Sequence, residues 1–139
     1  MPIIHRDTDY ALRALMTLAR DGGVVSVSDL SEQCNVPVDF LRKIMQKLHR
    51  EGIVRSVQGP TGGYGLQDSP EDIDLLRVLR AVQGPVVVNA CFDDPGMCDN
   101  TESCPVREKL ADLEVELCKW FQNMALSDML REGAHHGAA

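Results

Sequence analysis

Apolar positions in the first twenty residues recur at helical spacing and predict an amphipathic helix from Thr8 to Arg20. The residues on its apolar face are Ala11, Leu12, Leu15, Leu18 and Ala19. The sequence Asp21-Gly22-Gly23 ends this helix, because glycine and aspartate there favour a turn. The next four residues, Val24 to Val27, are typical of a short β segment.

Two further helices, with a short break between them, follow this segment. Ser28 is predicted to be the N-cap of a helix over Asp29–Cys34. Asn35-Val36-Pro37 breaks that helix, and a longer one runs from about Asp39 to Arg50. A short helix, a tight turn and a longer helix make the helix-turn-helix pattern.

The longer helix has two distinct faces. Its apolar stripe, which we expect to be buried, consists of Phe40, Leu41, Ile44, Met45 and Leu48. Its other face consists of Asp39, Arg42, Lys43, Gln46, Lys47 and Arg50. Such a face is ordinarily just solvated. Here it carries four cations and one acid and follows a helix-turn, which favours DNA, because arginine and glutamine reach base edges in the major groove and lysine neutralises phosphate.

A β-hairpin is predicted directly after the longer helix. Ile53–Gln58 is strand-like, and the glycine-rich sequence Gly59-Pro60-Thr61-Gly62-Gly63-Tyr64-Gly65-Leu66 supplies a turn and a second strand. A hairpin in this position is a wing, whose glycines let the backbone approach phosphate or enter a minor groove. Outside the long helix, the residues we expect to contact DNA are Ser28, Arg55, Gln58, Thr61 and Gly62.

Two more helices are predicted beyond the wing. Ser69-Pro70-Glu71 opens one that Gln83-Gly84-Pro85 ends, and Pro105 starts the last long one. Apolar residues recur along the last helix at alternating spacings of four and three residues: Val106, Leu110, Leu113, Leu117, Trp120 and Met124. This heptad pattern favours a dimerisation helix, and the alternative is a helix packed on its own domain.

The fold class expected from this order is mainly α with a small β wing: a winged helix-turn-helix plus a long C-terminal dimerisation helix. The chain of 139 residues divides into four predicted parts. These are a DNA-binding domain (1–85), a cysteine loop (86–104), the dimerisation helix with a short end helix (105–131) and a disordered tail (132–139). His135 and His136 in the tail are more simply incidental than ligands.

The net charge of −7 argues against nucleic acid when the chain is taken whole, but the two halves differ. Residues 1–66 hold eight Lys and Arg against seven Asp and Glu, a net of +1, whereas residues 67–139 hold six against fourteen, a net of −8. This asymmetry suggests that the first half meets an anionic partner. No stretch approaches the roughly 18 apolar residues of a membrane span, so we expect a cytoplasmic protein without a membrane partner.

Three of the five cysteines, Cys91, Cys98 and Cys104, lie in a segment rich in Asp, Gly, Pro, Asn and Ser. Cysteine is usually buried, so three in a polar loop indicate metal ligation, and thiolate is the preferred ligand of iron–sulfur clusters and zinc. A structural disulfide framework is disfavoured in a cytosolic chain with an odd number of cysteines. Zinc and a thiol redox switch remain alternatives. Cys34 and Cys118 are predicted to be packing residues.

Four motifs in this order resemble the Rrf-two family of bacterial transcription regulators, over about Thr8 to Leu130. They are Asp-Tyr-Ala-Leu-Arg (9–13), Phe-Leu-Arg-Lys-Ile-Met-Gln-Lys-Leu (40–48), Gly-Pro-Thr-Gly-Gly-Tyr-Gly-Leu (59–66) and the three loop cysteines. The resemblance implies a homodimeric regulator, a repressor, that binds double-stranded DNA at a palindromic operator. It also implies an iron–sulfur cluster on the loop cysteines, with 4Fe-4S favoured and 2Fe-2S possible.

The chain departs from the family at two positions. Arg107 stands where the iron–sulfur cluster regulator has a ligating histidine, and Gln58 stands where the wing usually has arginine. The nitric-oxide-sensitive branch uses an aspartate at the start of the first helix, from the partner subunit, as fourth ligand, and Asp9 matches it. The alternatives are a small molecule, no fourth protein ligand, or a nearby group such as His5, Asp7 or Glu102.

Two rival functions stay open. The first is the same DNA-binding fold acting as a cluster-free regulator that uses the loop cysteines as redox thiols or zinc ligands. The second is a small electron carrier or cluster-transfer protein with an incidental helix-turn-helix. No nucleophile set of His, Ser and Asp indicates catalysis, so we predict that the protein is not an enzyme.

Overall fold

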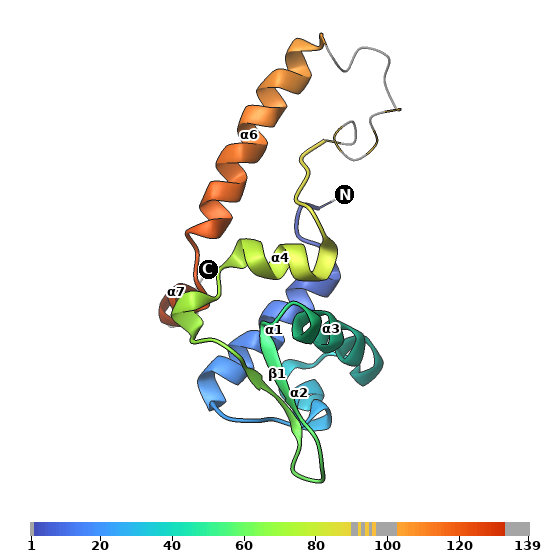
Figure 1. The fold of residues 1–139 in the computed structure, drawn as a ribbon, viewed down its shortest axis with the longest axis vertical. Coiled ribbons are helices and arrows are strands. Elements are labelled where there is room, and N and C mark those ends of the chain that lie inside the picture. The colour runs from blue at the N-terminus through green and yellow to red at the C-terminus, as the bar shows by residue number, and fades with distance from the viewer. Residues whose placement is uncertain (1, 90–91, 93, 95, 97–102, 133–139) are drawn as a thin grey trace.

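The computed structural model describes residues 2–89, 92, 94, 96 and 103–132. Nine elements follow one another within these residues (Figure 1). They are α1 (Arg6–Asp21), α2 (Val27–Cys34), α3 (Val38–Arg50), β1 (Val54–Val57), β2 (Gly63–Leu66), the 3₁₀ turn η1 (Pro70–Asp72), α4 (Leu75–Gln83), α6 (Pro105–Gln122) and α7 (Leu126–Glu132). The fold class is therefore the predicted one, mainly α with a two-stranded antiparallel wing.

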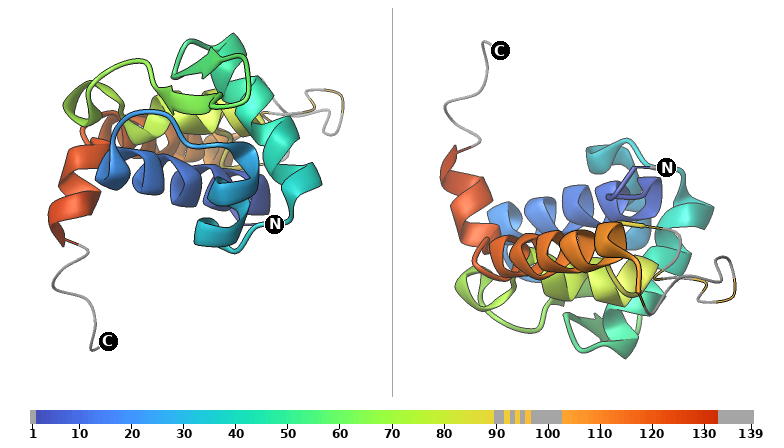
Figure 2. Two further views of the ribbon diagram at one scale, coloured as in Figure 1. Left: turned by 90° about the horizontal axis from the view of Figure 1, so that it is seen from below. Right: turned by 90° about the horizontal axis from the view of Figure 1, so that it is seen from above.

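Helix α1 is the central element, and it packs against α2, α3, α4, α7 and β2 (Figure 2). Its buried side chains join those of α2, α3, β1, α4 and α7 in the main hydrophobic core. A second, smaller cluster joins Leu75, Leu76 and Leu79 of α4 to Val86 and to Phe121 of α6. The winged helix thus has its own core, and α6 packs on it through the second cluster and α4.

The helix-turn-helix is fixed by its turn. Asn35 ends α2 in the left-handed conformation, with φ 56° and ψ 50°. The next residue, Val36, is buried, and its backbone is held at both ends by Ser31. The Val36 N–H donates to the Ser31 carbonyl at 3.2 Å, and the Ser31 hydroxyl donates to the Val36 carbonyl at 2.6 Å. The angle between α2 and α3 is therefore set by hydrogen bonds and by burial together.

The start of α2 differs from the prediction. Ser26, not Ser28, is the N-cap, and its hydroxyl oxygen accepts from the Asp29 N–H at 3.2 Å. The helix begins at Val27, so the predicted β segment is reduced to one residue. Val25 makes an isolated bridge to Tyr64, with two hydrogen bonds of 2.9 Å, which ties the base of the wing to the α1–α2 connection.

The helix predicted to open at Ser69 is interrupted. Pro70–Asp72 forms a 3₁₀ turn, Ile73 is extended, and α4 begins at Leu75 with Asp74 as its N-cap. The extended backbone forms a bridge to the segment before α7: the Leu75 N–H donates to Met124 at 2.8 Å and the Leu126 N–H donates to Ile73 at 2.9 Å. This tertiary pairing, which the sequence pattern does not show, replaces the helical hydrogen bonds.

Candidate nucleic-acid interface and cysteine site

The polar face of α3 is presented to solvent, as its sequence predicts. Leu41, Ile44, Met45 and Leu48 are buried against the core of the domain. The side chains of Asp39, Arg42, Lys43, Gln46 and Arg50 are exposed. None of these five takes part in an ion pair with another described residue. Three cations and a glutamine on one exposed face are therefore available to an anionic partner.

The predicted buried stripe of five residues is wrong at Phe40. Its side chain is 54 % exposed. Successive residues of a helix are separated by about 100°, which places Phe40 at the edge of the buried stripe, about a quarter turn from its centre. In the first turn of α3 this edge is not covered by the elements that bury Leu41 and Ile44. The sequence pattern could not show this, since it gives the helical angle but not the extent of the neighbours.

Lys47 also differs from the other cations of α3. Its ammonium donates a hydrogen bond of 3.1 Å to the carbonyl of Val82, in the last turn of α4. This carbonyl is one of the four at a helix end that have no partner within the helix. The Lys47 ammonium thus has a partner within the chain, and its predicted contact with DNA stays a prediction.

The wing lies directly after α3 and is shaped by its glycines. Strands β1 and β2 pair from Val54 with Leu66 to Val57 with Gly63. A Cβ on Gly65 would lie 2.6 Å from the Gly23 carbonyl and 3.3 Å from Nη2 of Arg55, so glycine is required for the wing to lie against the α1–α2 connection. Arg55 is the cross-strand partner of Gly65, and its guanidinium therefore lies beside Gly65.

The tip of the wing is exposed at Gln58 and Thr61. The Gly62 N–H donates to the Gly59 carbonyl at 3.0 Å and closes the turn. A Cβ on Gly62 would meet the Val57 carbonyl at 2.2 Å, so only glycine fits there. Ser28 is exposed in the first turn of α2, on the other side of the helix-turn. The structure therefore presents α2, α3 and the wing tip together with their predicted contact residues at the surface.

Of the three loop cysteines, Cys104 is within the described residues and is partly exposed as a thiol. It is the N-cap residue of α6, followed by Pro105 as the first helical residue. Its sulfur is therefore held at the start of a long helix and is reachable from solvent, as a metal-ligating cysteine requires. The described residues include neither the other two loop cysteines, Cys91 and Cys98, nor Glu102. The predicted ligand set therefore stays a prediction.

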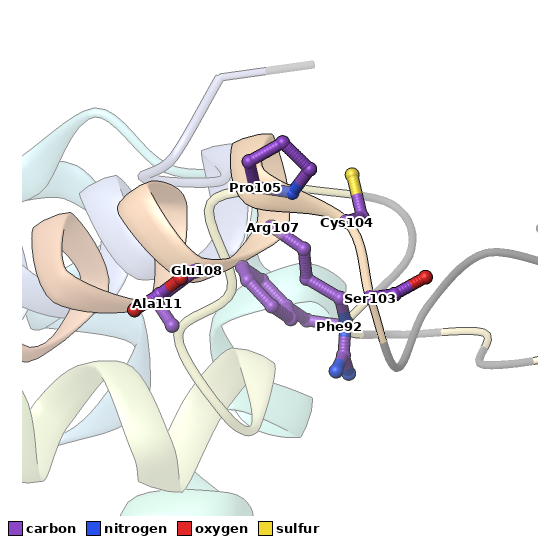
Figure 3. A pocket seen from close by; sticks show the side chains of 7 residues that line it. All are labelled: Phe92, Ser103, Cys104, Pro105, Arg107, Glu108 and Ala111. Carbon is purple, nitrogen blue, oxygen red and sulfur yellow. The ribbon is translucent and has the colours of Figure 1, made fainter.

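A cavity of about 310 Å³ lies beside Cys104 (Figure 3). Its lining residues are Phe92, Ser103, Cys104, Pro105, Arg107, Glu108 and Ala111. The Arg107 guanidinium lies over the Phe92 ring, 5.0 Å from its centroid. Figure 3 shows the Cys104 sulfur and the Arg107 guanidinium pointing away from each other. Arg107 therefore joins the start of α6 to Phe92 through an aromatic contact.

The candidate fourth ligand, Asp9, is exposed in the first turn of α1, and its carboxylate forms an ion pair with Arg13. Asp7 is exposed in the same turn, and His5 precedes the helix as its N-cap residue. Cys34 is buried, 3.3 Å from the Thr17 hydroxyl. Cys118 packs against the second core cluster. Both positions agree with packing residues.

The predicted seam of α6 divides into two rows. Leu117 packs against the second core cluster, and so does Met124, which lies beyond the end of α6 at Gln122. Leu110 is partly buried. Val106, Leu113 and Trp120, seven residues apart, are 61 %, 53 % and 55 % exposed. One row thus holds α6 to its own domain, and the other row is exposed on the helix that rises from the domain (Figure 1). Packing on its own domain is observed for the first row, and dimerisation through the second stays a prediction.

Two side chains that sequence reasoning missed lie at the junction of α1 and α4. Thr8 is completely buried, and its hydroxyl donates to Oε1 of Gln83 at 2.6 Å. The sequence pattern indicates Gln83 only as part of a helix end. A signal was present, since a hydroxyl on the apolar side of a helix needs a buried partner. The identity of that partner, 75 residues away, was not accessible from the sequence.

A helix-turn-helix with an exposed cationic face, followed at once by a wing, defines a winged-helix DNA-binding protein. Residues 4–132 match the Rrf2 family, described as iron-dependent transcriptional regulators, and the chain belongs to this family. Its members and the relatives found here are transcription regulators rather than enzymes. The Rrf-two resemblance is therefore confirmed.

Several known proteins are similar to this chain. One is an HTH-type transcriptional regulator of Azotobacter vinelandii, 33 % identical over 87 % of this chain and 74 % of that protein. IscR of T. potens, with a TM-score of 0.71 and 25 % identity, matches over 98 % of this chain and 91 % of that one. CymR, the global cysteine regulator of B. subtilis, has a TM-score of 0.75 and 22 % identity over 94 % and 98 %, which shows a shared fold.

Proposed function

We propose that this protein is a homodimeric repressor whose binding to a palindromic DNA operator is controlled by an iron–sulfur cluster held by Cys91, Cys98 and Cys104. DNA-binding transcription regulation is the function of the family. The dimer, the operator symmetry, the cluster and the cytoplasmic location are our proposals. The observation that carries them is the exposed cationic side of α3 in a chain whose α6 is preceded by a partly exposed thiol.

DNA recognition is assigned to α3 in the major groove. Arg42 and Gln46 are placed to read base edges, because both side chains can make paired hydrogen bonds to a base. Lys43 and Arg50 would neutralise phosphates beside them. Around the helix we place Ser28, Asp39, Arg55, Gln58, Thr61 and Gly62. Ser28 and Asp39 lie at the starts of α2 and α3, and the wing residues would follow the backbone or the minor groove.

Dimerisation is assigned to the outward row of α6. Val106, Leu113 and Trp120 expose apolar side chains along one line, which is costly in water and typical of a surface covered in the assembled protein. A second copy of α6 offers the same row, so the contact can be symmetric. Two α3 helices related by a two-fold axis would match a palindromic operator. Leu110, Leu117 and Met124 would support the row from its inner side.

One described residue, Cys104, supports a cluster. Cys104 presents a partly exposed thiol at a helix N-terminus, and the family is described as iron-dependent. Cys91, Cys98 and Cys104 would hold the cluster, and Asp9 of the partner subunit would complete the ligand set, for which 4Fe-4S is favoured over 2Fe-2S. When bound, such a cluster supplies iron chemistry that responds to oxidants and to nitric oxide. The protein's own part is to hold the thiolates and to position α3.

The cluster-free alternative is favoured by one observation: the partly exposed thiol of Cys104 is also accessible to an oxidant, as a redox-active cysteine must be. The test is anaerobic purification followed by measurement of iron, acid-labile sulfide and zinc. A duplex selected by the protein from a random-sequence library then serves to compare matched cluster-loaded and cluster-free protein. Iron and sulfide in near-equal amounts together with a difference in affinity support the proposal. Colourless protein containing zinc, or no metal, supports the alternative.

A further inference from the structure

The last turn of α4 is held by residues from two parts of the chain that are far away in the sequence. Lys47 reaches it from the recognition helix α3, and the N-terminal segment reaches it from the start of α1. The chain leaves this turn through Gly84, with φ +90°, and continues toward the cysteine loop. Three functional parts of the molecule therefore meet within two residues, Val82 and Gln83.

The Gln83 side chain makes three hydrogen bonds to the N-terminal segment. Its Oε1 accepts from the backbone N–H of His5 at 3.0 Å and from the Thr8 hydroxyl at 2.6 Å. Its Nε2 donates to the carbonyl of Ile3 at 2.8 Å. The Thr8 side chain has no access to solvent, so water cannot replace that bond without opening the contact between α1 and α4. The segment that leads into the turn bearing Asp9 is thus fixed to α4.

Lys47 makes the second contact with the last turn of α4. Its ammonium donates to the Val82 carbonyl at 3.1 Å, in a partly buried position. A cation at the C-terminal end of α4 is also favoured by the helix dipole. This bond links α3 to the end of α4. A shift of that end would also move α3, because a close-packed core has low compressibility and transmits strain.

We propose that Gln83 and Lys47 are positioning residues of a junction that couples the start of α1, and the chain entering the cysteine loop, to the recognition helix. The inference rests on the proposed role of α3 in DNA binding, and it gives the route by which a change at the loop reaches the operator. Neither side chain then acts by touching DNA. Gln83 acts through Val82 and Lys47, and Lys47 acts on the placement of α3.

A double-mutant cycle on cluster-free protein tests the junction directly. Operator affinity is measured by fluorescence anisotropy for the parent, Gln83→Ala, Lys47→Met and the double variant. We expect each single change to alter affinity and the two to be non-additive, because both act on the same turn. The coupling expected for residues in one such network is about 2- to 30-fold in affinity. Additive effects would overturn the proposal.

Salt dependence separates positioning from phosphate contact at Lys47. If Lys47 neutralised a phosphate, Lys47→Met would reduce the slope of log affinity against log salt by about one. We expect an unchanged slope for Lys47→Met and a reduced slope for Lys43→Ala. A reduced slope for Lys47→Met would assign Lys47 to DNA and remove it from the junction.

Two substitutions of Thr8 separate loss of the hydrogen bond from general unfolding of the protein. Thr8→Val keeps the shape of the side chain and loses the donor, whereas Thr8→Ser keeps the donor. We expect Thr8→Val to change operator affinity in the same direction as Gln83→Ala and Thr8→Ser to restore the parent value. Gln122→Ala, at an exposed position near the end of α6, is the control for loss of an amide. Equal behaviour of Thr8→Val and Thr8→Ser would contradict the junction.

Failure of this inference and failure of the proposed function give different results. The parent alone tests the function, through the ratio of its affinities with and without cluster. A ratio of one would refute control by the cluster, while a coupled double-mutant cycle would still establish the junction. If the ratio differs from one, we expect Gln83→Ala to bring it toward one with the iron content unchanged. A parent-like ratio in Gln83→Ala would show that the signal takes another route.

Discussion

The carboxylate of Asp9 lies 2.9 Å from Nη2 of Arg13, one turn further along α1. Both side chains are about half exposed, so this ion pair is worth no more than about 1 kcal/mol and is weakened by salt. A contact of this strength holds Asp9 in place at the helix start, yet it is weak enough to be exchanged for a metal ion. The ion pair is thus compatible both with a ligand and with a carboxylate that only complements the helix dipole.

Replacing Asp9 distinguishes these two roles. We expect Asp9→Ala, purified without oxygen, to show an altered cluster absorbance and faster loss of colour in air, because one iron would lose its protein ligand. Arg13→Ala is the matched control, since it removes the ion pair and leaves the carboxylate. Absorbance, nuclearity and decay rate in Asp9→Ala that equal those of the parent would make Asp9 a helix-terminus residue only.

The cysteines should divide into ligands and packing residues. We expect Cys104→Ser to lose most of the bound iron, because serine is a poor ligand for a cluster that prefers thiolate. Cys34→Ser and Cys118→Ser should keep the absorbance of the parent, since Cys34 lies in the core beside Thr17 and Cys118 packs against the second core cluster. Iron content and visible spectra are the measurements. Colour loss in Cys118→Ser equal to that in Cys104→Ser would contradict this division.

Two neighbouring cations on α3 should behave differently. Arg42→Ala should weaken operator binding by about 1–3 kcal/mol and relax specificity at one base position, because a base contact is lost. Lys43→Ala should weaken all duplexes alike, because a phosphate contact carries no sequence information. The measurement is affinity for the selected duplex and for a panel of single-base variants. Unchanged affinity in both variants would show that this face of α3 does not meet DNA.

Much of this architecture could be predicted, because α1, α3 and α6 have periodic apolar faces that depend on local sequence alone. The errors occur where distant contacts decide. Ile73 is extended because its carbonyl pairs with Leu126. The start of α2 is a local exception, since Ser26 rather than Ser28 caps the helix through Asp29. Phe40 is exposed because its neighbours end short of it. In the site, charge and exposure of α3 followed from the pattern, whereas the bond from Lys47 to Val82 depends on how α4 packs.

The outward row of α6 offers the most direct test of the assembly. Leu113 lies in the middle of the row formed with Val106 and Trp120 and is 53 % exposed. We expect Leu113→Glu to give a monomer in sedimentation velocity at micromolar concentration, because a charge buried between two copies lacks a partner. Operator affinity should fall with it, since two half-sites would no longer be bound by one assembly.

A matched control comes from the same helix. Val115 is 54 % exposed, yet it follows Leu113 by two residues and so lies about 200° around the helix from it. We expect Val115→Glu to stay dimeric and to bind the operator like the parent. The pair thus separates a specific interface from a general effect of added charge on α6, which is already acidic. If Leu113→Glu remained a dimer, the row would not be the interface, and if both variants became monomers, the contact would extend around α6.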